Sequence, residues 1–274
     1  MTAHDPLTLL VLNSGGVLVR GLHSNTAPPI PPALAGEFLP RHTAWRTRVL
    51  SAPAGFDGER AILKRFSYDQ GVLSLATGYR SYTEGLALRD SLQHARMHRR
   101  LALAPQDLLA PRDELCWGMS LTCYILLPQN HVLCAERDSR LFSLPGAWTC
   151  SHTEIIEPTD VDQANMQPLL ERLVNEELPA LTGLGSLKFV GLGLRTKSYL
   201  WQLVGILDLR QYDIAELTPA LLALQPDAET ASWGVYPLKD APSKNPYPDV
   251  LHSPANALHD LEVANYLNCA VPVC

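Results

Sequence analysis

The second half of the chain contains four apolar segments, and they restrict the fold more than any other feature of the sequence. These segments cover residues 119–127, 131–137, 187–194 and 199–209. Short polar connections, at 128–130 and 195–198, join the members of each pair. The pattern predicts two pairs of neighbouring strands, which need a common sheet to bury their apolar side chains.

The first part of the chain, residues 1–110, also predicts mostly strands. A hairpin is expected where Ser14-Gly15-Gly16 separates two apolar segments. Five prolines lie between residues 26 and 40, and the cluster at 28–32 predicts extended, irregular chain. The two arms of the expected hairpin are 7–13 and 17–20, further strands are expected at 45–52, 61–66 and 72–76, and a helix at 83–98.

Pro105 and Pro111 mark a boundary, after which a second region, 111–274, is expected. Besides the four strands, this region predicts a short strand after Trp148 and a polar loop at 157–165. Helices are expected at 167–178, 214–224 and 255–267, and a late strand at 233–238. Because strands predominate over helices, the sequence predicts an α+β sandwich behind a smaller β-rich N-terminal region.

The helix expected at 167–178 carries two carboxylates in an unfavourable place. Glu177 falls in the middle of its apolar face, and Glu176 lies at the edge of that face, one turn after Arg172. The helix dipole disfavours negative charge in the last turn, and a buried carboxylate needs a partner. The pattern therefore indicates a cation near these glutamates, either an arginine or a metal ion.

A simpler interpretation of the same helix stays open. Glu177 could turn into water where the helix ends, since Pro179 stops it. Arg172 and Glu176 could then form an exposed pair one turn apart, which stabilises a helix by only about 0.2–0.5 kcal/mol.

The segment 172–177 resembles part of the signature motif of the Nudix superfamily. That motif reads G-x5-E-x7-R-E-U-x-E-E-x-G-U, where U is apolar, and Arg172-Leu173-Val174-Asn175-Glu176-Glu177 is similar to its R-E-U-x-E-E segment. The preceding strand pair and the turn Pro145-Gly146-Ala147-Trp148 resemble the family's approach to the motif. The resemblance covers residues 115–240, and it implies an α/β/α sandwich with a mixed sheet.

The sequence departs from this motif at three places. Leu173 stands where the motif has a glutamate, and Pro179-Ala180 replace the x-G that usually ends the helix. Glu154 lies 18 residues before Arg172 and Glu157 lies 15 before it, where the motif requires eight. A longer loop, 157–166, could absorb the difference, with Glu154 the better candidate.

The resemblance implies a role for five residues. Glu176 and Glu177 would bind Mg²⁺ or Mn²⁺, Arg172 would orient them by a salt bridge, and Glu154 would add a ligand or accept a proton. Arg137 lies where many members of the family carry an arginine, which implies substrate binding. The function implied is metal-dependent hydrolysis of a nucleoside-diphosphate-linked compound. The alternative is a catalytically inactive Nudix-fold protein that binds a nucleotide or a protein.

Another segment, Trp148-Thr149-Cys150-Ser151-His152, is similar to a Trp-Thr…Cys-x-His segment of isopentenyl-diphosphate isomerases. Here it is two residues shorter, and the strand expected at 119–127 has no histidine to complete a metal site. We therefore do not expect isomerase chemistry. Cys150 is expected as a buried strand thiol and His152 as a loop residue.

The net charge of −6 predicts no strong attraction to nucleic acid or to an anionic membrane. No apolar run approaches the roughly 18 residues that a membrane-spanning helix needs. The six cysteines form no C-x-x-C pair and follow no secretion signal, so we expect reduced thiols and a cytoplasmic protein. The expected partner is a nucleotide or another diphosphate-containing small molecule, and the sequence leaves a homodimer open.

Overall fold

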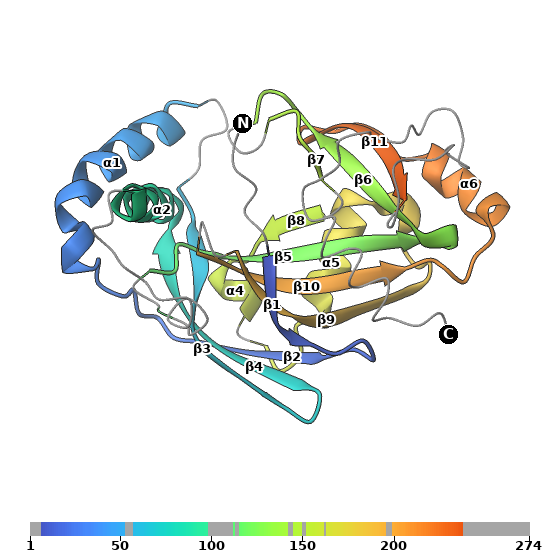
Figure 1. Ribbon diagram of the computed structural model, residues 1–274, viewed down its shortest axis with the longest axis horizontal. Coiled ribbons are helices and arrows are strands. Elements are labelled where there is room, and N and C mark those ends of the chain that lie inside the picture. Colours follow the sequence, from blue (N-terminus) through green and yellow to red (C-terminus); the bar gives the residue numbers. More distant parts are fainter. Residues whose placement is uncertain are drawn as a thin grey trace.

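The computed structural model describes residues 7–52, 57–97, 112, 115–141, 145–149, 152–161, 163–195 and 199–237. These residues form two sheets of unequal size with helices packed against them (Figure 1). The larger sheet contains both parallel and antiparallel pairs, so the expected α+β class with a mixed sheet is confirmed. No helix in the described part of the chain is long and apolar enough to cross a membrane.

The larger sheet has eight strands, six of which form the path β1-β9-β10-β5-β6-β11. In that order they are Leu7–Leu12, Ser186–Arg195, Leu200–Asp208, Met119–Leu127, His131–Arg137 and Thr230–Pro237. Off this path, β7 (Trp148–Thr149) pairs with β6 and β8 (His152–Ile155) pairs with β5. β10 and β5 are parallel, and the other pairs of this sheet are antiparallel. The strands expected from the four apolar segments and from residues 233–238 are confirmed.

The middle strands of the larger sheet are covered on both faces. Every residue of β5 is buried. Its alternate side chains belong to two separate apolar clusters, with Ile125 in one and Tyr124 in the other. A strand that is covered on both faces requires a continuous apolar sequence, and β5 has one.

Helix α5 (Gln167–Glu177) packs on one face of the larger sheet through four buried side chains, Leu169, Leu170, Leu173 and Val174. Each of them contributes about 1.5–3 kcal/mol by leaving water. A Cβ atom on Gly205 of β10 would lie 2.6 Å from the side chain of Leu170, so the missing side chain lets the helix approach the sheet. The helix ends before the short 3₁₀ turn η2 (Pro179–Leu181), as the proline predicts.

The smaller sheet has the order β2-β4-β3, formed by Leu18–His23, Val72–Ser81 and Glu59–Asp69. Helix α2 (Tyr82–Met97) follows β4 directly, and α1 (Pro32–Leu50) packs beside it. Figure 1 shows this helix pair at the end of the molecule far from α6 (Ile214–Leu222). The helices expected at 83–98 and 214–224 are confirmed as α2 and α6.

The predicted hairpin at the N-terminus is wrong. β1 pairs antiparallel with β9 in the larger sheet, whereas β2 pairs parallel with β4 in the smaller one. The connection between them stays attached to β9, because Asn13 N–H donates to Val190 O and Val17 N–H to Phe189 O. Gly16, with φ of 106°, lets the chain turn there. Longer-range pairing has therefore outweighed the local turn signal.

The strand predicted at 45–52 is also wrong, because these residues end helix α1. Leu34, Phe38 and Val49 are buried at helical spacing. Trp45 lies on the same face, and its Nε1–H donates to Asp90 of α2 at 2.7 Å. The β-branched character of the segment gave the wrong period, and packing against α2 decides the structure.

The loop predicted at 157–165 contains one helical turn, α4 (Pro158–Val161). Between β6 and α5 the short strands β7 and β8 occupy the place of the single strand expected after Trp148. The helix predicted at 255–267 and the thiol of Cys150 lie outside the described residues.

Candidate acidic site

The structure brings Glu154 of β8 near the two glutamates that end α5. The pKa of Glu177 is raised to about 7, first by burial and then by Asp227, Glu229, Glu154 and Glu176. These five carboxylates are called the acidic cluster below. Since neighbouring carboxylates raise the pKa of Glu177, this carboxyl group lies where negative charge is not fully balanced by positive charge.

Arg172 binds one member of the acidic cluster, Glu154, and the nearby Asp160. Its Nη2 forms an ion pair with Glu154, and its Nη1 donates to Asp160 Oδ1 at 2.7 Å. A further hydrogen bond of 3.2 Å joins Nη2 to Asp160 Oδ2. The expected salt bridge of Arg172 is therefore directed to Glu154 and Asp160, across the cluster, and not along the helix to Glu176 or Glu177.

Glu154 lies on a strand, and not at the start of an exposed loop. Burial raises the pKa of its carboxyl group, and the hydrogen bond from Arg172 opposes this effect. Its Oε1 accepts from Arg172, while its Oε2 is buried without a hydrogen-bond partner. One oxygen of Glu154 is thus held and the other is available for a ligand.

His152 lies in β8 two residues before Glu154 and is buried, with 5% of its surface exposed. It was expected in a loop, but its ring stacks on the indole of Trp233 in β11. Burial lowers the pKa of the imidazole to about 4, against a smaller opposing effect of Asp227. The ring is neutral at physiological pH, and its Nε2 is buried without a hydrogen-bond partner.

Asp227 and Glu229 come from the loop before β11, and sequence reasoning missed both. Asp227 Oδ1 accepts hydrogen bonds from the backbone N–H groups of Glu229 and Thr230, at 2.7 and 2.6 Å. A carboxylate oxygen of Glu229 lies 4.0 Å from Nη2 of Arg137, the last residue of the neighbouring strand β6. Arg137, which the sequence predicts to bind substrate, lies beside the acidic cluster because it pairs with Thr230, the residue after Glu229.

Leu173 does not belong to the acidic cluster. It is 1% exposed and packs in the apolar core between α5 and the sheet. The position at which the Nudix motif has a third helical glutamate is therefore directed into the core of this protein.

The donor set suits a hard divalent cation, because carboxylate oxygens are the ligands that Mg²⁺ and Mn²⁺ prefer. The unpartnered Oε2 of Glu154 and the charge around Glu177 also fit such an ion. In the described ranges, however, no three acidic, histidine or cysteine side chains are grouped closely enough to hold a metal ion. The residues fit the ion chemically, and their side chains would have to move to coordinate it.

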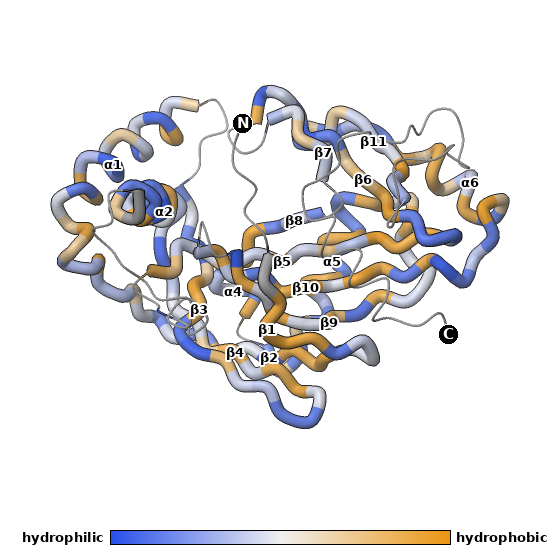
Figure 2. Tube along the Cα trace, viewed as in Figure 1, coloured by the Kyte–Doolittle hydropathy of each residue, from blue (hydrophilic) through white to orange (hydrophobic). Residues whose placement is uncertain are grey.

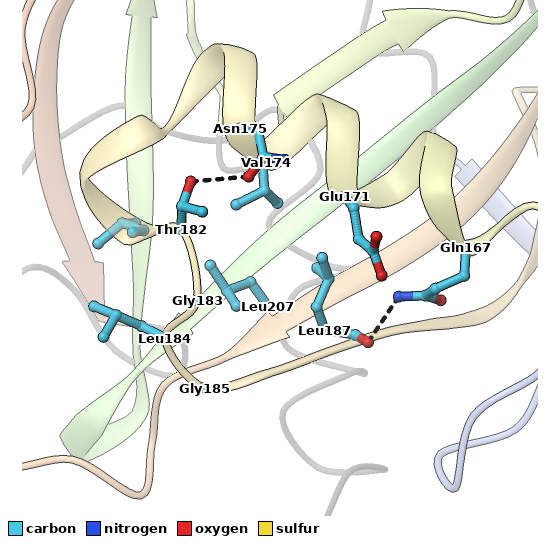
Figure 3. A pocket seen from close by; sticks show the side chains of 11 residues that line it. Gln167, Glu171, Val174, Asn175, Thr182, Gly183, Leu184, Gly185, Leu187 and Leu207 are labelled. Carbon is cyan, nitrogen blue, oxygen red and sulfur yellow. Dashed lines mark hydrogen bonds between the residues drawn. The ribbon is translucent and has the colours of Figure 1, made fainter.

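A separate groove of about 360 Å³ follows the opposite edge of α5 (Figure 3). Gln167, Glu171 and Asn175 line one wall, while leucines and the 182–185 loop line the other. Gln167 Nε2–H donates to Leu187 O, and Thr182 Oγ1–H donates to Asn175 Oδ1. The groove shares no residue with the acidic cluster.

Hydrophobic residues predominate along the central strands of the larger sheet (Figure 2). An exception is Gln202 of β10, whose Nε2 donates to Ser120 and Thr122 of β5 at 2.8 and 2.7 Å. These three residues are buried beside the second apolar cluster, on the face away from α5. Glu154 pairs with Leu121, between Ser120 and Thr122, but it lies on the opposite face of the sheet, where Arg172 of α5 reaches it.

Comparison of the chain with models of known families and with curated proteins finds no match to either. The acidic cluster, with Arg172 across it, is therefore interpreted from its own geometry and from the motif at 172–177.

Proposed function

We propose that this chain is a Nudix-type, metal-dependent hydrolase of a nucleoside-diphosphate-linked compound that acts in the cytoplasm. The observation that supports this most is the convergence of four other carboxylates on Glu177, with Arg172 fixing Glu154 beside them. Structural ion pairs alone would leave little reason to gather so much unbalanced negative charge, because like charges repel.

In this proposal Glu176, Glu177 and Glu154 would hold Mg²⁺ or Mn²⁺, with Asp227 as a further oxygen donor. When bound, the ion would neutralise the diphosphate and favour attack by water at phosphorus. Glu154 would contribute its free Oε2 while Arg172 keeps Oε1 in place. Arg137 would bind a phosphate oxygen in exchange for its 4.0 Å contact with Glu229.

Calorimetric titration with Mn²⁺ tests the proposal, on the wild type and on the double variant Glu176→Gln/Glu177→Gln. We expect saturable binding in the wild type and none in the double variant. Glu171→Gln is a matched control, because Glu171 lies on the same helix but lines the groove on its other edge. The control should bind Mn²⁺ as the wild type does, and nucleoside-diphosphate sugars can then be screened for hydrolysis.

The proposal is wrong if the wild type shows no saturable Mn²⁺ binding, even with a nucleoside diphosphate present. A catalytically inactive protein that binds a nucleotide or a protein is the second candidate. It is favoured by the burial of Leu173, which leaves the helix with one carboxylate fewer than the motif, and by the absence of a pre-formed group of ligands among the described residues. Nucleotide binding without metal and without hydrolysis would support this candidate.

A further inference from the structure

The chain on both sides of α4 is attached to the smaller sheet, at Ile156 before it and at Gln163 and Met166 after it. Ala61 N–H of β3 donates to Ile156 O at 2.9 Å. Gly21 N–H of β2 donates to Gln163 O at 3.0 Å, and Met166 N–H donates back to Val19 O at 2.9 Å. The segment that leads into α5 therefore takes its position from strands that lie more than 90 residues earlier in the sequence.

The contact between β2 and α4 leaves no room for a side chain. A Cβ atom added to Gly21 would overlap the carbonyl oxygen and the Cγ1 atom of Val161. Backbone atoms of α4 cannot move aside as a flexible side chain does. The glycine is thus required for α4 to lie directly on the smaller sheet.

The same turn of helix anchors Arg172. Asp160 has 8% of its side chain exposed, and its Oδ2 accepts the Glu157 N–H at 2.8 Å. Both of its oxygens also accept from Arg172, at 2.7 and 3.2 Å. A fork of two parallel hydrogen bonds fixes the plane of a guanidinium group as well as its place. Arg172 Nη2 also donates a hydrogen bond to Glu154 Oε1.

We infer that the smaller sheet positions residues of the acidic site. It holds α4 in place, α4 carries Asp160, and Asp160 positions Arg172 beside Glu154. Asp160 is a positioning residue in this arrangement, since it acts on the acidic cluster only through Arg172. The inference concerns how the site is assembled, and only its metal-binding test rests on the proposed function.

The first experiment needs no metal and follows the titration of the Glu154 carboxyl carbon by ¹³C NMR, in the wild type and in Asp160→Asn. Arg172, Asp160, Glu176 and Glu177 are the charged groups that act on Glu154. Loss of the Asp160 charge alone would lower the pKa of Glu154, because a nearby negative charge disappears. Loss of positioning would raise it, because Arg172 leaves Glu154. We expect a rise; a fall, or no change, would overturn the inference.

The second experiment compares two glycine variants of the smaller sheet. Gly21→Ala pushes α4 away. Gly78 lies on β4 of the same sheet, and Gly78→Ala crowds the carbonyl oxygen of Thr26, outside the sheet, and not α4. We expect Gly21→Ala to weaken Mn²⁺ binding by about tenfold or more, as loss of a supporting contact does at metal sites. Gly78→Ala should bind Mn²⁺ about as tightly as the wild type, because it leaves the contact between β2 and α4 unchanged.

Equal weakening by both glycine variants would show a general effect of strain and would contradict the inference. If the wild type itself binds no Mn²⁺, the proposed function fails, and the Glu154 titration still decides whether Asp160 positions Arg172. Circular dichroism identifies any variant that does not fold. Asp160→Asn is the variant least affected by this problem, because its amide oxygen can still accept the Glu157 N–H.

Discussion

The imidazole of His152 stacks on the indole of Trp233, with ring centroids 5.1 Å apart and ring planes inclined by 25°. This contact joins β8 to β11 beside the acidic cluster, and it keeps the imidazole away from water. The stack therefore makes the stability of the protein sensitive to acid.

His152 should make a measurable part of that acid sensitivity. Its pKa in the folded protein is about 4, below the ordinary value of 6.5, so the unfolded chain binds a proton that the folded chain does not. Its contribution is complete above pH 6.5 and is lost as the pH falls toward 4. We expect His152→Phe, which keeps a stacking ring, to lose less stability than the wild type over this range. Urea unfolding at pH 7, 5.5 and 4 checks this, and parallel losses in both proteins would contradict it.

Glu177 should have the opposite pH dependence. Its pKa is raised to about 7 in the folded protein, mainly by burial, so the folded chain holds a proton that the unfolded chain releases above about 4.5. Stability from this group is present at low pH and is lost as the pH rises through 7. Without metal, Glu177→Gln should therefore be more stable than the wild type at pH 8. At pH 4.5 the difference should shrink, and thermal unfolding at the two pH values measures it.

Restoring the missing glutamate of the motif should not improve the site. Leu173→Glu would place a carboxylate in the apolar core, where an unpaired charge is strongly disfavoured. Leu173→Ala, which leaves only a cavity, should cost about 2–5 kcal/mol. We expect Leu173→Glu to be at least as destabilised as Leu173→Ala in chemical denaturation at pH 8. A stable Leu173→Glu protein with tighter Mn²⁺ binding would show that this helix position can reach the acidic cluster.

Trp45 should be the main link between the two N-terminal helices. Its Nε1–H donates to Asp90, and the guanidinium carbons of Arg48 and Arg89 lie 5.1 and 5.8 Å from the centre of its ring. Trp45→Phe keeps an aromatic ring but loses the hydrogen bond to a charged group, which should cost about 1.5–3 kcal/mol. Urea unfolding measures the loss. Asp90→Asn should cost less, because its amide oxygen can still accept the bond.

The sequence predicts the parts of this fold that local pattern determines. The strands β5, β6, β9 and β10 are mostly buried, and each was predicted from its run of apolar residues. Helix α5 was predicted from its apolar face and from the prolines near its two ends. The segment that begins at Trp45 was wrongly predicted as a strand, because its short sequence fits both a strand and a helix. Its packing against α2, which the sequence does not show, decides for the helix. Asp160 was missed because its function depends on an arginine twelve residues later, and on a sheet that no local pattern connects to it.

For the acidic site, the motif at 172–177 led to Arg172, Glu176 and Glu177, and the structure places Glu154 with them. Asp227 and Glu229 are brought there by β11, which follows them and whose first residue, Thr230, pairs with Arg137 of β6. That pairing is antiparallel and joins segments about 90 residues apart, so the sequence alone does not indicate it.

The place of β1 limits how this protein can be divided. Leu7–Leu12 is the first strand that the structure describes, and it lies on the outer side of β9, where it occupies the hydrogen-bonding edge of that buried strand. A shortened protein that begins at residue 115 would expose this edge, and an apolar edge without a partner readily pairs with other molecules. We therefore expect a protein shortened in this way to aggregate more readily than the full chain, and the region that carries the acidic cluster should be expressed together with β1.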